Sequence, residues 1–155
     1  MPSQFPTLIH ERVELSRQGK NKTVVCKMKS GWVVLGDDQR LKGYSLLLSD
    51  PVVDSLNAHE MPQRIQFLSD MTVVGDALTE VLNPSIINYS ILGNTDRALH
   101  AHIHPRYNTE SPEKRRTIPF IYNIDKMPCI PFDYERDKAL IVAIRNSIIK
   151  RGGCN

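Results

Sequence analysis

The chain has 155 residues, of which 41% are hydrophobic and 24% charged, and its formal net charge is +3. This is the composition of an ordinary globular domain, so it argues against intrinsic disorder, collagen-like repeats and a membrane protein, and predicts a single domain over residues 1–155. A dedicated nucleic-acid binder would carry a denser basic stripe, so we expect no nucleic-acid partner. Three cysteines without a CxxC spacing, and a start without the features of a signal peptide, predict a reduced, cytoplasmic protein.

The first half of the chain predicts a short helix followed by three strands. A helix is expected over residues 5–18, with three residues on one face: Ile9, Val13 and Ser16. The strands are expected over residues 23–28, 32–36 and 44–48. Because turn residues such as Ser30-Gly31 separate these short strands, they suggest an antiparallel meander.

The second half begins with the clearest periodic signal. Between Gln63 and Val81, apolar residues recur at helical spacing: Phe67, Met71, Val74, Leu78 and Val81. Two pairing strands are expected over residues 86–92 and 99–103, and a last helix over about 133–150, with Ile141, Ile144 and Ile148 inward. The predicted fold class is α+β, an antiparallel sheet of about five strands with helices on one side, the long helix packed on one face.

Three of the five histidines lie within five residues, at His100, His102 and His104. Strand side chains alternate between faces, so these three would share one face, with Arg106 continuing the row and the intervening residues in the core. Charging one imidazole disfavours charging its neighbour, which keeps the row neutral near pH 7. Three interpretations stay open: an exposed polar face of an edge strand, a metal site, or a nucleophilic histidine acting on a phosphoryl group.

The residues around this row resemble the signature of the histidine-triad (HIT) family. The resemblance rests on Ile91-Leu92-Gly93-Asn94 and on the run from Leu99 to Tyr107, which includes Pro105-Arg106. It extends upstream through residues 31–37 and 43–51, and so covers about residues 24–107, leaving a C-terminal extension. The subgroup it looks most like is that of diadenosine tetraphosphate hydrolases. The resemblance implies a HIT-like fold and a homodimer.

The register in which the chain is aligned with the family decides which histidine is the nucleophile and which contacts phosphate. Anchored on Pro105-Arg106, the three histidine positions of the family fall on Ala98, His100 and His102, and His104 takes the place of an apolar residue. The alternative register makes His100, His102 and His104 the triad. In the favoured register the resemblance implies that His100 is the nucleophile, that His102 contacts phosphate, and that the Ala98 carbonyl accepts the other ring N–H of His100.

The activity implied is hydrolysis at the α-phosphate of an adenine nucleotide or dinucleoside polyphosphate, through a covalent nucleotidyl-histidine. The alternative is a nucleotide-binding or interaction protein with little turnover. The candidate substrate contacts are Asn94, at phosphate or as an ordinary turn residue, and Asp37, at ribose as the resemblance implies or as a hairpin-turn aspartate. Arg106 is expected at the far end of a polyphosphate or in a salt bridge, and His104 as a partial substitute for the first histidine or a surface substitution. An aliphatic wall for the base is expected from Val33, Leu35 and Leu46. No resident metal or cofactor is expected; magnesium would enter only with a polyphosphate substrate.

Overall fold

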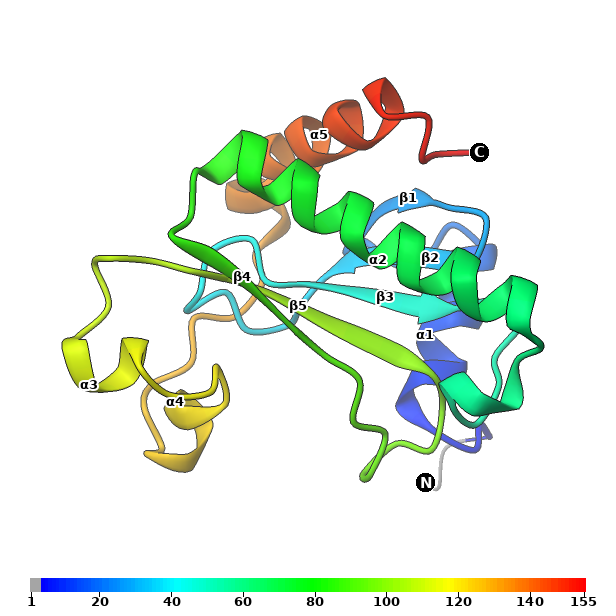
Figure 1. Cartoon of the computed structure of the whole chain (residues 1–155), viewed down its shortest axis with the longest axis horizontal. Helices are drawn as coiled ribbons and strands as arrows, with labels where there is room; N and C mark the ends of the chain where they lie inside the picture. Colours follow the sequence, from blue (N-terminus) through cyan, green and yellow to red (C-terminus); the bar gives the residue numbers. More distant parts are fainter. Residues whose placement is uncertain (1–3) are drawn as a thin grey trace.

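The computed structural model describes residues 4–155, which form one antiparallel sheet with helices on both faces (Figure 1). The strands lie in the order β1-β2-β3-β5-β4. Their bounds are β1 Val24–Lys27, β2 Gly31–Leu35, β3 Ser45–Ser49, β4 Ile86–Ser90 and β5 His100–Arg106. The helices are α1 Leu8–Arg17, α2 Met61–Leu82, α3 Pro112–Arg115, α4 Ile121–Ile124 and α5 Tyr134–Lys150, with a 3-10 turn at Leu56–Ala58. The predicted α+β class and the antiparallel five-stranded sheet are confirmed.

The larger core lies between the sheet and the helices α2 and α5, which pack side by side on one face (Figure 1). Alternate strand residues such as Val33, Leu47 and Ala101 point into this core. The predicted helical stripe of α2 is buried from Phe67 to Leu78, whereas Val81 is only partly buried. The inward face predicted for the last helix is confirmed at Ile141, Ile144 and Ile148. Among residues 4–155, every helix is too short or too polar to cross a bilayer.

The helix α1 covers the opposite face of the sheet, so the expectation that all helices pack on one side is wrong. Ile9 and Val13 pack against Val34, Leu48 and Ala98 in a second, smaller core. The reason is that β2 and β3 carry apolar side chains on both faces, and each face must be covered. The face predicted for α1 is confirmed, since Ile9, Val13 and Ser16 are its buried residues.

Residues 107–131, which gave little sequence signal, fold back over the same face as α1 (Figure 1). They contain the short helices α3 and α4. Arg40 holds this segment in place, because its guanidinium donates to the carbonyls of Tyr122 and Met127 and to the side chain of Asn123. The segment brings Phe120 against the histidines of β5.

Candidate functional site

The three histidines of β5 share one face of the sheet, as predicted from strand alternation. The ring centroids of His100 and His102 lie 4.8 Å apart, and those of His102 and His104 lie 6.0 Å apart. The alternate residues of the same run are buried in the core: Leu99, Ala101 and Ile103. The strand therefore separates an imidazole face from an apolar face.

His100 is held by a backbone carbonyl at the start of β5. Its Nδ1 lies 2.7 Å from the carbonyl oxygen of Ala98, and the residue is 7% exposed. A carbonyl only accepts hydrogen bonds, so Nδ1 carries the ring proton and Nε2 of the neutral ring keeps its lone pair. This is the bond that the register anchored on Pro105-Arg106 requires of Ala98.

His100 and His102 line a cleft of about 360 Å³ together with Phe120 and the loop from Leu92 to Asp96. Gly93 turns this loop with a φ of 70°, a left-handed conformation that favours glycine. Asn94 follows it and lines the cleft beside both histidines. His100 also borders a second pocket of about 400 Å³, which includes Arg97 and shares the loop residues 92–94 with the cleft. The structure thus brings Asn94, His100 and His102 together.

His102 is a partly buried, neutral imidazole with a hydroxyl on one ring nitrogen. Its Nδ1 lies 2.6 Å from the hydroxyl oxygen of Tyr44, and Phe120 meets its ring edge-on at 5.2 Å. Burial, with a smaller contribution from the charge of His100, lowers the pKa of His102 to about 4. Desolvation, and not the expected repulsion within the row, is therefore the larger cause of the neutral state of His102.

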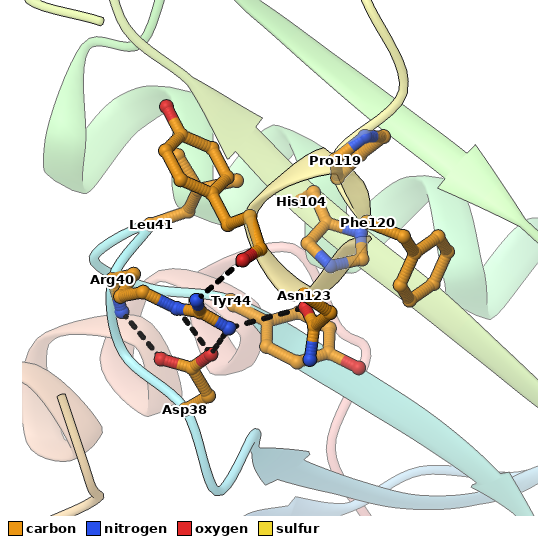
Figure 2. Close-up of a pocket in the computed structure, with 9 residues that line it drawn as sticks. Asp38, Arg40, Leu41, Tyr44, His104, Pro119, Phe120 and Asn123 are labelled. Carbon is orange, nitrogen blue, oxygen red and sulfur yellow. Dashed lines mark hydrogen bonds and ion pairs between the residues drawn. The ribbon is translucent and has the colours of Figure 1, made fainter. Parts of the chain in front are cut away.

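His104 is not a surface substitution, because only 5% of it is exposed. Its ring stacks on that of Tyr44 at 4.0 Å with an interplanar angle of 6°, and Phe120 packs against it (Figure 2). Burial first, and then the charges of His102 and Arg106, lower the pKa of His104 to about 3. Its Nδ1 has no hydrogen-bond partner among the described residues. His104 lines a separate cavity of about 100 Å³ rather than the cleft of His100.

Arg106 is a structural residue, and the expectation that it meets a polyphosphate is wrong. It is 1% exposed and forms a salt bridge with Glu110. Its five N–H groups are directed at Glu110, at the side chain of Asn88 and at the carbonyls of Lys114 and Thr117. The salt-bridge alternative is the one that the structure shows, because residues 107–131 fold over this end of β5.

Asp37 lies outside the cleft, just after β2. Its carboxylate accepts two hydrogen bonds, 2.9 Å and 2.7 Å long, from the guanidinium of Arg12 in α1. The side chain is 62% exposed, so its oxygens remain open to a hydroxyl-bearing ligand. The structure does not bring Asp37 into contact with the histidine row.

The aliphatic wall expected from Val33, Leu35 and Leu46 is only partly correct. Val33 and Leu35 point into the core beneath α2, while Leu46 pairs with both Val34 and His102 and so lies on the histidine face. Because side chains alternate along a strand, the residue of β2 that lies beside Leu46 on the histidine face is Val34, and not Val33 or Leu35.

Two aromatic residues of the site, Tyr44 and Phe120, are absent from the sequence-based prediction. Tyr44 lies two residues before Leu46, so alternation along β3 was a signal that could have placed it on the histidine face. Phe120 comes from an irregular segment and had no comparable signal. Within residues 4–155, no three His, Cys, Asp or Glu side chains are grouped so as to hold a metal ion.

The fold matches solved structures of histidine triad proteins. One from Marinobacter aquaeolei VT8 aligns with a TM-score of 0.71 and 16% identity over 94% of this chain and 98% of that chain. Another from Bradyrhizobium japonicum aligns with a TM-score of 0.67 and 22% identity, over 86% of this chain and 95% of that chain. A diadenosine triphosphate hydrolase from Plasmodium falciparum, in complex with cyclomarin A, aligns with a TM-score of 0.58 and 15% identity, over 84% of this chain and 78% of that chain.

At these identities the likeness shows the fold, so the chain has the HIT-like fold that the resemblance implied. Neither models of protein families nor curated protein sequences match the chain.

Proposed function

We propose that this chain hydrolyses an adenine nucleotide at its α-phosphate, with His100 as the nucleophile. The observation that carries the proposal is the bond between His100 Nδ1 and the Ala98 carbonyl, 2.7 Å long. It leaves the lone pair on Nε2 of a ring that lines an open cleft. A neutral imidazole fixed in this tautomer is a competent nucleophile toward phosphorus.

The reaction proceeds in two displacements. Nε2 of His100 forms a bond to the α-phosphorus while the bond from phosphorus to the leaving group breaks. Water then attacks the phosphorus, the P–N bond breaks, and the nucleoside monophosphate leaves as His100 is regenerated. His102, neutral because burial lowers its pKa to about 4, donates a hydrogen bond to a non-bridging oxygen and stabilises the charge that builds there.

The other substrate contacts that we propose are Asn94 at the phosphate and Asp37 at the ribose hydroxyls. Asn94 lines the cleft beside both histidines. The exposed Asp37 carboxylate, oriented by Arg12, is an acceptor of the kind that a pair of ribose hydroxyls needs. The substrate class is a phosphoanhydride such as diadenosine tetraphosphate or a phosphoramidate, and magnesium enters only with a polyphosphate.

We also propose that the chain forms a homodimer through β4. The outer edge of β1 is partly covered by the end of the chain. Cys154 forms an antiparallel β-bridge with Met28, and the N–H of Asn155 donates a hydrogen bond to the carbonyl of Lys27. At the other end of the sheet β4 pairs with β5 alone and exposes Ile86 and Tyr89. An uncovered edge with apolar side chains favours pairing with a second copy. Light scattering should give twice the chain mass, and a mass near 17.6 kDa would contradict the dimer.

The activity is tested by incubating the protein with a panel of adenine nucleotides and adenine phosphoramidates and measuring AMP release. We expect release by the wild type and by the control His59→Ala, whose side chain lies outside the cleft, and none by His100→Ala. Binding of AMP without release from any substrate would favour the nucleotide-binding alternative. Full activity in His100→Ala would rule out the proposed nucleophile.

A further inference from the structure

Tyr44 lies between two cross-strand neighbours, Gly36 and His104. The pairs Leu35–Ser45 and Ser45–Ile103 set the register of β2, β3 and β5, and one residue further along this register Gly36 and His104 flank Tyr44. The N–H of Gly36 donates to the Tyr44 carbonyl at 2.8 Å, which confirms the first neighbour. The stacked rings of Tyr44 and His104 confirm the second.

The phenol ring is clamped from both sides. A Cβ atom at Gly36 would lie 2.3 Å from Cδ1 and 2.4 Å from Cε1 of Tyr44, so the ring occupies the space that any other residue would fill. On the other side the imidazole of His104 lies parallel to the phenol ring, 4.0 Å away. Figure 2 shows His104 next to Tyr44, with Phe120 beside it. The ring therefore has little freedom to turn, and its hydroxyl is held in one place.

That hydroxyl acts as a donor to His102. Burial, with the nearby charges of Asp37 and Asp38, raises the pKa of Tyr44, so the oxygen keeps its proton. Among the described residues the one partner of this hydroxyl is Nδ1 of His102, 2.6 Å away. If Nδ1 instead donated, the tyrosine proton would have no acceptor within the described structure. Both groups have a hydrogen-bond partner when the Tyr44 hydroxyl donates to Nδ1, and the ring proton of His102 is then on Nε2.

We infer that Tyr44 is a positioning residue for His102: clamped between Gly36 and His104, its hydroxyl donates to Nδ1 and keeps the Nε2 proton available for a substrate phosphate. The inference rests on the proposed function. The Ala98 carbonyl and the Tyr44 hydroxyl then set adjacent histidines in opposite tautomers, His100 as nucleophile and His102 as donor. His104 is the platform for Tyr44 rather than a third member of the catalytic row.

The first test is nitrogen-15 NMR of the histidine rings, which needs no enzymatic activity. In the wild type and in the control Tyr134→Phe, on the distant helix α5, His102 should show a protonated Nε2 and an unprotonated, hydrogen-bonded Nδ1. In Tyr44→Phe, which removes only the oxygen, His102 should become a tautomer mixture and its pKa should rise, because the hydrogen bond to the neutral ring is lost. Gly36→Ala should do the same by displacing the ring. A wild-type ring with its proton on Nδ1, or an unchanged His102 in Tyr44→Phe, would overturn the inference.

The second test measures AMP affinity and the rate of hydrolysis. Tyr44→Phe should lose about ten- to a hundred-fold in kcat, the effect of one unsatisfied hydrogen bond at the site. Normal turnover in Tyr44→Phe, with an altered His102 tautomer, would overturn the positioning role while leaving the proposed function intact. A wild type that shows the expected tautomers but neither binds nor hydrolyses adenine nucleotides would refute the proposed function, and the inference with it.

Discussion

Replacing His104 by phenylalanine should stabilise the protein. The imidazole is 5% exposed, and its Nδ1 is buried without a partner among the described residues. Such a group costs about 1–3 kcal/mol of folding free energy. A phenyl ring keeps the stack on Tyr44, and the adjoining cavity of about 100 Å³ leaves room for its slightly larger size. We therefore expect His104→Phe to raise the free energy of unfolding by about 1–2 kcal/mol at pH 7.5.

The difference in free energy of unfolding between His104→Phe and the wild type should increase as the pH falls. Burial lowers the pKa of His104 to about 3, from about 6.5 in the unfolded chain. As the pH falls below about 6.5 the unfolded state takes up a proton that the folded state does not, so stability is lost by about 1.4 kcal/mol per pH unit until the folded pKa is reached. At pH 5 this amounts to about 2 kcal/mol, which the phenylalanine variant does not lose.

The assay is urea denaturation of both proteins at pH 7.5, 6 and 5. Subtracting the two curves cancels the carboxylates that also titrate in this range. The control is His59→Ala, at a partly exposed position, which tests whether the effect belongs to the buried site. If the difference between wild type and His104→Phe is the same at pH 7.5 and pH 5, or if the variant is less stable at both, the buried His104 ring is not the destabilising group.

Three further predictions can be tested with the same protein. His100→Ala should abolish AMP release, while His104→Phe, which keeps the stack on Tyr44, retains most of it; equal losses, with the adduct on His102, would support the alternative register. Arg106→Ala should lower the free energy of unfolding by about 3–5 kcal/mol, because it leaves the buried Glu110 carboxylate unpaired, and a loss under 1 kcal/mol in denaturant melts would contradict this. EDTA should leave hydrolysis of an AMP phosphoramidate unchanged, and loss of that activity on chelation would favour a metal-activated water.

The elements with a strong local period were predictable from the sequence. The apolar spacing between Phe67 and Leu78 is a property of one helix, and burial of that stripe confirms it. The same holds for Ile9 and Val13 in α1 and for the alternation of histidine and apolar residues in β5. Each of these patterns depends only on how a helix or strand orients its own side chains.

The parts that depend on distant contacts were not predictable. His104 and Arg106 are buried because residues 107–131 fold over them, and that segment has neither helical nor strand periodicity. Val33 and Leu35 lie on the core face and not on the expected face, because a shift of one residue along a strand exchanges its two faces. The role of Tyr44 depends on the register of three strands at once, which no local pattern specifies.

Covalent catalysis by His100 can be tested by trapping the intermediate. The protein is mixed with substrate, quenched rapidly without acid, digested, and sequenced by tandem mass spectrometry. We expect an AMP-sized addition on the peptide from Leu99 to Arg106, located on His100 and absent from His100→Ala. An adduct on His102, or full turnover with no adduct on any histidine, would rule out His100 as the nucleophile.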